Sequence, residues 1–131
     1  MSSYRSRLAA ATTGAVLIVG LMGVSPAEAK DGDVRVAGTC TARSQSKLKL
    51  GPRGGTIEAE FEVDSNKVGQ RWTVTLTDNG VRVFTGARTT TAPSGSFSAR
   101  ARIANRAGRD NVVARATNAA TGESCVARAS V

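Results

Sequence analysis

Three glutamates at alternate positions come closest to a catalytic arrangement in this chain. Glu58, Glu60 and Glu62 are each separated by one residue, so in an extended strand they project from one face about 6.5–7 Å apart. That spacing overlaps the separation of the two carboxyl groups in inverting glycosidases. Such enzymes also need a cleft that raises the pKa of one carboxyl group. A solvated row on the outer face of an antiparallel sheet explains the same pattern and is the favoured interpretation.

The other chemically capable groups lack the partners that catalysis or metal binding requires. The chain has no histidine, which removes the commonest general base and the commonest metal ligand. Asp31-Gly32-Asp33 and Asp64-Ser65-Asn66 are oxygen-rich, but calcium needs six to eight oxygen ligands, and Asp and Asn favour turns without any metal. We therefore expect a protein that is not an enzyme and has no metal site or cofactor.

The first 29 residues have the features of a secretory signal peptide. Arg5 and Arg7 precede an uncharged run over residues 8–24, and the small residues Ala27 and Ala29 close the segment. This order predicts cleavage after Ala29. The uncharged run is at the short limit for a membrane span, so the alternative of a membrane anchor is less favoured. We expect a secreted protein, either extracellular or associated with the cell wall, with no transmembrane segment in the mature chain.

The mature chain, residues 30–131, has room for one small basic domain. The full chain has 18 basic and 10 acidic residues, and removal of two arginines and one glutamate with the signal peptide leaves 16 and 9. Both cysteines, Cys40 and Cys125, lie in this part. An even number of cysteines in an exported chain, without C-x-x-C spacing or histidine, predicts a structural disulfide. In the chain-entropy model such a long loop contributes at most about 4–5 kcal/mol.

Short alternating runs separated by turn residues predict an all-β fold. In residues 56–64 apolar and acidic side chains alternate, and in residues 70–77 Trp72 begins an inward row, followed by the hairpin signal Asp78-Asn79-Gly80. Trp72 is expected to be the central core residue. No segment long enough for a helix has a 3.6-residue period, so we predict an antiparallel β-sandwich of seven or eight strands. The other predicted strands are residues 33–41, 47–50, 81–84, 96–103, 111–117 and 125–131.

Two segments resemble parts of bacterial immunoglobulin-like domains. They are Gly-Ser-Phe-Ser-Ala-Arg at residues 95–100 and Ala-Thr-Asn-Ala-Ala-Thr-Gly-Glu-Ser-Cys at residues 116–125, which joins the last two predicted strands. Because of these segments and its pattern of about eight short strands, the mature chain is similar to small secreted Gram-positive proteins of undefined role. The resemblance implies an immunoglobulin-like sandwich over residues 30–131. It does not extend to the tyrosine corner of antibody domains, because the mature chain has no tyrosine.

Arginine dominates the second half of the mature chain. Residues 81–131 contain eight basic and two acidic side chains. Arg100, Arg102 and Arg115 stand opposite the apolar positions of two predicted strands, so we predict that they form an outward basic face that binds anionic envelope polymers. The alternative is that these arginines only solubilise the protein and pair with the glutamate row across the sheet.

The sequence therefore favours a secreted, non-catalytic binding or structural module. Its expected partner is an anionic cell-wall polymer or an extracellular protein. Nucleic acid is not expected as a partner, because the protein is exported and its aromatic residues occupy strand-interior positions. The alternative function is that of a secreted inhibitor or small-ligand carrier acting through turn loops, for which Arg53 and Arg109 are the candidate residues. Steep salt dependence is expected only of polyanion binding.

Overall fold

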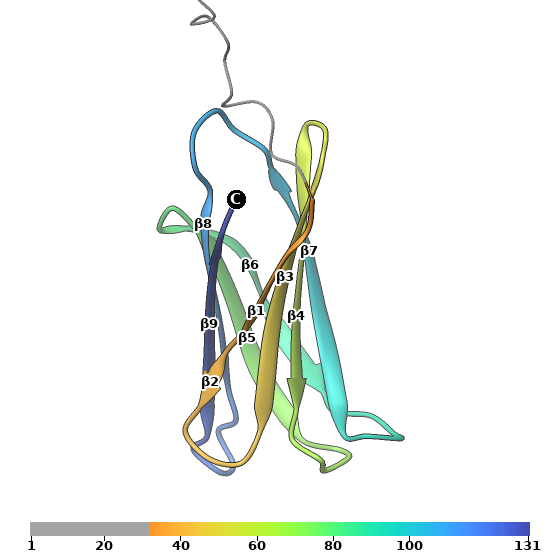
Figure 1. The fold of residues 1–131 in the computed structure, drawn as a ribbon. Helices are drawn as coiled ribbons and strands as arrows, with labels where there is room; N and C mark the ends of the chain where they lie inside the picture. The colour runs from red at the N-terminus through yellow and green to blue at the C-terminus, as the bar shows by residue number, and fades with distance from the viewer. Residues whose placement is uncertain (1–31) are drawn as a thin grey trace, which may run out of the picture.

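The described part of the chain is built entirely of strands. The computed structural model describes residues 32–131, which form nine strands and no helix (Figure 1). The predicted all-β class is confirmed, whereas the predicted signal peptide and its cleavage site lie outside the described residues. Within residues 32–131 no helix is long and apolar enough to cross a membrane. The strands are β1 (Val34–Ala37), β2 (Thr39–Cys40), β3 (Gln45–Arg53), β4 (Thr56–Asp64), β5 (Arg71–Asp78), β6 (Val81–Thr89), β7 (Ser96–Ala104), β8 (Asn111–Thr117) and β9 (Ser124–Ser130).

The strands form two antiparallel sheets that make a β-sandwich. The four-stranded sheet has the order β1-β3-β4-β7, and the five-stranded sheet has the order β2-β9-β8-β5-β6. Apolar side chains at alternate positions of both sheets point inward, as expected for sheets with one buried and one solvated face. Figure 1 shows β4 and β7 in one layer and β8 and β9 in the other.

The predicted single strand at residues 33–41 is wrong, because the chain changes sheets at Gly38. β1 pairs with β3, whereas β2 pairs with β9 in the other sheet. A Cβ atom at Gly38 would lie 2.2 Å from the hydroxyl oxygen of Ser46 and 2.7 Å from the carbonyl oxygen of Val126. Only glycine therefore fits at this crossing, and the division of one predicted strand into two gives nine strands instead of seven or eight.

Two other strands are longer than predicted. β3 continues through Gly51 and Pro52, which pair with Glu58 and Ile57 of β4, so the predicted turn shortens to the residues around Gly54, where φ is +65°. β6 continues past Phe84 to Thr89 because its whole length pairs with β5. Neither continuation shows a clear apolar alternation, and pairing with the neighbouring strand decides the backbone conformation.

Trp72 is the largest fully buried side chain in a core made mostly of aliphatic residues. Its side chain is fully buried, as predicted, and its ring contacts that of Phe97 at a centroid distance of 6.3 Å and a tilt of 52°. Trp72 belongs to β5 and Phe97 to β7, so the contact joins the two sheets. The other large buried side chains include Leu48, Leu50, Ile57, Phe61, Val63, Val74 and Leu76.

Candidate binding surfaces

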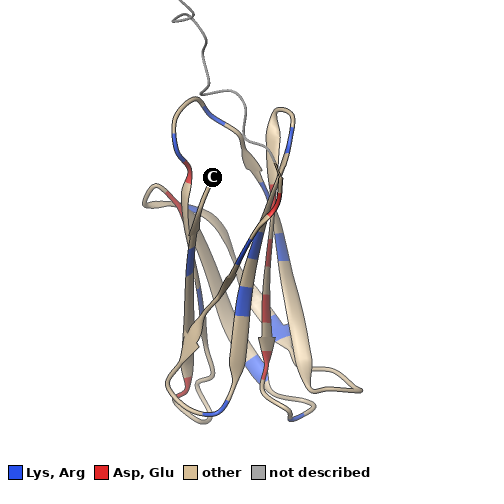
Figure 2. Ribbon diagram, in the orientation of Figure 1, with Lys and Arg blue, Asp and Glu red and all other residues tan. Residues whose placement is uncertain are grey.

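The outer face of the four-stranded sheet carries an acidic strand between two basic strands. β4 places Glu60 opposite Arg100 and Glu58 opposite Arg102 of β7, with N–O distances of 3.0 Å and 4.0 Å. On the other side, Lys47 of β3 lies 3.4 Å from Glu62. Figure 2 shows this acidic row along β4 between the basic bands of β3 and β7. The pairing of arginines with the glutamate row, the alternative raised from the sequence, is thus present for Arg100 and Arg102.

A second ion-pair cluster surrounds Asp33 at the edge of the same face. Its carboxylate lies 2.9 Å from Arg53, 3.5 Å from Lys49 and 3.7 Å from Arg35. The hydrogen bond from Arg53, together with the positive charges of Arg53 and Lys49, lowers the pKa of Asp33. The same hydrogen bond raises the pKa of Arg53. Arg53, expected as a turn residue for partner recognition, is exposed, and its guanidinium is held by Asp33.

A hollow of about 360 Å³ on this face lies beside Gly51. Its lining contains both cationic and anionic side chains of the ion pairs described above, including Lys49, Glu60 and Arg100. An incoming ion of either sign would have to compete with an existing intramolecular partner. We therefore assign no ligand to this hollow.

Arg115 does not share a face with Arg100 and Arg102, which corrects the predicted polyanion surface. Arg100 and Arg102 belong to β7 in the four-stranded sheet, whereas Arg115 belongs to β8 in the five-stranded sheet. All three side chains point outward, but the outer faces of the two layers point in opposite directions. Alternation along a strand predicts which side chains point outward without identifying the sheet to which the strand belongs.

Arg115 lies instead among other arginines on the outer face of the five-stranded sheet. We call this surface the arginine face and define it by Arg71 of β5, Arg82 of β6, Arg115 of β8 and Arg128 of β9. All four residues are exposed. Their outward direction follows from the register, which aligns Arg71 with Thr89, Arg82 with Thr77, Arg115 with Thr75 and Val126, and Arg128 with Val113.

The arginine face carries no acidic side chain among the described residues. Its remaining outward positions on β5, β6, β8 and β9 are mainly threonine and serine, with a few small apolar residues and one asparagine. None of the four arginines forms an ion pair within residues 32–131. Asp78, the acidic residue of β5, is buried on the inward side of that strand. The two outer faces therefore differ in kind: one is neutralised by ion pairs and the other is cationic.

Three of these arginines lie along a diagonal of the sheet. From the register and the usual strand dimensions, Arg128 and Arg115 are about 8 Å apart and Arg115 and Arg71 about 14 Å apart at their Cα atoms. The diagonal from Arg128 to Arg71 is thus about 22 Å long. Arg82 lies to one side of it, on the edge strand β6.

Aromatic side chains contribute nothing to the arginine face within the described chain. Trp72, Phe61 and Phe97 are buried in the core. Phe84 is half-buried, and the Arg88 guanidinium stacks over its ring at 5.0 Å from the centroid. Phe84 aligns with the inward-facing Leu76, so this stack is at the interior side of β6.

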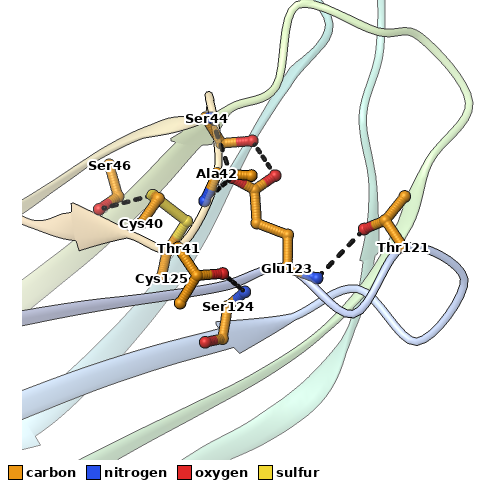
Figure 3. The surroundings of a disulfide bond; sticks show 9 residues. All are labelled: Cys40, Thr41, Ala42, Ser44, Ser46, Thr121, Glu123, Ser124 and Cys125. Atoms are coloured by element: carbon orange, nitrogen blue, oxygen red, sulfur yellow. Dashed lines mark hydrogen bonds between the residues drawn. A yellow bond between two sulfur atoms is a disulfide. The ribbon is translucent and has the colours of Figure 1, made fainter.

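The predicted disulfide is confirmed. Cys40 of β2 and Cys125 of β9 are directly opposite each other and are joined as a disulfide. Beside it, the Glu123 carboxylate accepts hydrogen bonds from the backbone N–H groups of Ala42 and Ser44, both at 3.0 Å, and from the Ser44 hydroxyl at 2.6 Å (Figure 3). Cys40, Cys125 and Glu123 are close enough to be considered as metal ligands. However, the two cysteine sulfurs are bonded to each other, and the Glu123 carboxylate already accepts three hydrogen bonds.

The two oxygen-rich segments have turn and ion-pair roles in the described residues. The Asp64 side chain accepts a hydrogen bond from the Asn66 backbone N–H at 2.9 Å, and Asn66 has φ +58°, which is the side-chain-capped turn that these residue types favour. Asp33 is the centre of the ion-pair cluster with Arg35, Lys49 and Arg53. Asp31 lies outside the described residues. Arg109 is exposed in the β7–β8 loop, where its carbonyl accepts a hydrogen bond from Asn79.

Comparisons of the chain with protein-family models, with curated proteins and with solved structures find no match. The class of protein that the geometry defines is a disulfide-bonded, two-sheet antiparallel β-sandwich.

Proposed function

We propose that this protein is an exported, non-catalytic module that binds linear anionic polymers through the arginine face. The observation that carries the proposal is the contrast between the two outer faces. The cations of the four-stranded sheet have carboxylate partners, whereas Arg71, Arg82, Arg115 and Arg128 have none in the described chain. A charged group with no intramolecular partner can bind an external anion without first breaking an ion pair.

The arrangement of these arginines favours an extended ligand over a compact one. The diagonal of about 22 Å is longer than the Debye length of about 8 Å at physiological ionic strength, so a single small ion interacts with one or two arginines at most. A polymer with repeated negative charges can contact all of them. Arginine can bond bidentately to phosphate or carboxylate groups, and the threonine hydroxyls between the arginines can donate or accept further hydrogen bonds.

The same surface disfavours single-stranded nucleic acid. Proteins that bind such strands use exposed aromatic rings on which successive bases stack. The aromatic side chains of residues 32–131 lie in the core or at the interior side of β6. A polymer without bases, such as an anionic wall polymer or glycan, matches the available charges and hydroxyls better.

The finer fold assignment, an immunoglobulin-like domain, is also part of this proposal. In the constant immunoglobulin type, the C, F and G strands share one sheet, and β5, β8 and β9 have equivalent places here. Trp72 lies on β5, which corresponds to the strand that carries the buried tryptophan of antibody domains. The disulfide differs, because it joins β2 and β9 of one sheet instead of linking the two sheets.

Co-sedimentation with isolated bacterial cell wall tests the proposed function. The variant Arg71→Gln, Arg115→Gln, Arg128→Gln removes three charges from the arginine face. The matched control removes three exposed charges from the opposite face by Arg35→Gln, Lys47→Gln and Arg102→Gln. Both variants lose the same net charge, so non-specific attraction falls equally.

The proposal predicts that the parent and the control sediment with the wall at low salt and that the arginine-face variant does not. It also predicts that added salt releases the parent, since the binding depends on charge. Equal binding of the two folded variants would show that net charge alone acts and would overturn the assignment to this face. Retention of the parent at high salt would favour recognition through a loop.

A further inference from the structure

One end of the sandwich contains a hollow that is separate from the arginine face. It has a volume of about 680 Å³ and is lined by residues 41–44, 65–67, 70 and 121–123, which belong to three loops at residues 41–44, 65–70 and 118–123. Figure 1 shows these loops together at one end, opposite the β3–β4 hairpin. The volume is within the usual range for small-molecule sites, about 300–1,000 Å³.

The wall formed by residues 41–44 is fixed from two sides. The Cys40–Cys125 disulfide anchors its start, and the Glu123 carboxylate receives the N–H groups of Ala42 and Ser44 together with the Ser44 hydroxyl (Figure 3). These three donors fix the carboxylate in place. Its negative charge remains, so an anion in the hollow requires cations in the same lining to outweigh it.

The wall formed by residues 65–70 is braced by the β6–β7 loop. Gly69 donates its N–H to the Thr90 carbonyl, and Thr90 donates its own N–H to the Gln70 carbonyl, both at 2.8 Å. Gly95 packs so closely that a Cβ atom there would lie 2.3 Å from the Lys67 nitrogen. This wall is therefore held by hydrogen bonds and by close backbone packing.

The third wall is tied around a buried asparagine. The side-chain oxygen of Asn118 accepts hydrogen bonds from the N–H groups of Ala120 at 3.0 Å and Thr121 at 3.3 Å, and the Asn118 N–H donates to the Glu123 carbonyl at 2.9 Å. All three walls thus satisfy much of their own backbone polarity. Such a hollow is formed before any ligand arrives, which reduces the ordering cost of binding.

Three side chains lining this hollow retain unused binding capacity. Arg43 and Lys67 are exposed and form no ion pair within the described chain. The side-chain oxygen of Gln70 is buried without a hydrogen-bond partner among residues 32–131. Because this oxygen is fully buried, a ligand in the hollow reaches it only after the Gln70 side chain rotates toward the hollow. The unused groups are therefore two cations and one acceptor.

We propose that this end hollow binds one small hydroxylated anion, either a sugar acid or a polyol phosphate. Arg43 and Lys67 pair with its carboxylate or phosphate, and the Gln70 amide, once rotated toward the hollow, accepts a hydrogen bond from one of its hydroxyl groups. The lining offers hydroxyls at Thr41, Ser65 and Thr121 and no aromatic ring, which fits a polar ligand. The inference is independent of the arginine face and gives specific residues to a small-ligand role.

Titrations followed by ¹⁵N–¹H NMR test this site with four probes. Glucuronate and glycerol 1-phosphate represent the two sources of a hydroxylated anion, inorganic phosphate is an anion without a polyol, and glycerol is a neutral polyol. We expect saturable shifts of the amide signals in residues 41–44, 65–70 and 118–123 with at least one of the first two probes. We expect at least tenfold weaker binding of inorganic phosphate and no saturation with glycerol.

Variants separate the contributions of charge and of the acceptor. Arg43→Gln with Lys67→Gln should weaken the binding of the preferred probe at least tenfold, whereas the charge-matched pair Arg82→Gln with Arg128→Gln should change it less than twofold. Gln70→Leu should weaken the binding of the hydroxylated anion and leave the binding of inorganic phosphate unchanged. If neither hydroxylated anion gives saturable shifts at tens of millimolar, or if loss of both cations leaves the affinity unchanged, the site is wrong. If inorganic phosphate binds as well as the hydroxylated anions, the assigned ligand class is wrong.

Discussion

Replacement of Trp72 should remove most of the stability of the domain. The side chain is fully buried, and an aromatic side chain of this size buries about 150–250 Å². At about 25 cal/mol per Å² this area corresponds to about 4–6 kcal/mol. Alanine retains part of that contribution, so we expect Trp72→Ala to lower the free energy of unfolding by about 3–5 kcal/mol. Small domains have about 5–15 kcal/mol in total.

Trp72→Phe should behave very differently, because the indole nitrogen is a cost in the parent. This nitrogen is buried without a hydrogen-bond partner within the described chain, and an unsatisfied buried donor costs about 1–3 kcal/mol. Phenylalanine loses part of the buried ring area, worth about 1 kcal/mol, and removes the unpaired donor. The free energy of unfolding should therefore stay within about 1 kcal/mol of the parent value.

Urea unfolding followed by far-ultraviolet circular dichroism measures both variants. This signal is needed because Trp72 is the only tryptophan and its fluorescence disappears in both. A loss below about 1 kcal/mol for Trp72→Ala would contradict its role as the central core residue. A loss above about 3 kcal/mol for Trp72→Phe would mean that the indole N–H has a stabilising partner after all.

Three further changes test separate parts of the fold. Gly95→Ala should lower the free energy of unfolding by about 1–3 kcal/mol more than Gly122→Ala in urea titrations. Both glycines have positive φ, but only a Cβ atom at Gly95 would meet backbone atoms. Equal losses of stability in the two variants would contradict this close packing. Asp33→Asn should lessen the loss of stability on acidification: the pKa of Asp33 is lowered in the folded state, so its contribution is present above the usual aspartate pKa of about 4 and disappears as the pH falls below it. An unchanged acid-unfolding curve would contradict this cluster. Joint replacement of Cys40 and Cys125 by alanine should cost up to about 4–5 kcal/mol in thermal or urea unfolding, and an unchanged midpoint would contradict a stabilising disulfide.

Strands with strict alternation were predictable from the sequence because burial of one face fixes their register. The residue ranges expected for β4 and β8 agree with the structure. The division of β1 from β2 was not predictable from alternation, since it depends on the space left by Ser46 and Val126 around Gly38. The full length of β6 was also hidden, because pairing with β5 and not apolar alternation maintains it.

The candidate surfaces show a similar division between local and long-range information. Alternation placed Arg100, Arg102 and Arg115 on outward positions, but the assignment of β7 and β8 to different sheets separates them. The signal for the arginine face was present locally, since Arg71 precedes outward threonines in the same strand. Its significance required the strand order, which brings Arg128 and Arg115 onto neighbouring strands.

The end hollow had no comparable local signal. Its three walls come from loops far apart in the sequence, and the hydrogen bonds from Ala42 and Ser44 to the Glu123 carboxylate join residues 81 and 79 positions apart. The disulfide was predictable because only two cysteines are present. Its position beside this hollow was not.

The central claim, that the arginine face binds linear polyanions, can be measured on individual arginines. The ¹⁵Nε–¹Hε signal of each arginine side chain reports directly on its contact with an anion, and long-chain inorganic polyphosphate is a suitable probe. On titration at low salt, we expect large, saturable shifts for Arg71, Arg115 and Arg128, with Arg100 and Arg102 unaffected in their ion pairs. Added salt should reverse these shifts. Larger shifts for Arg100 and Arg102 than for Arg115 and Arg128, or uniform shifts of every arginine, would contradict this claim.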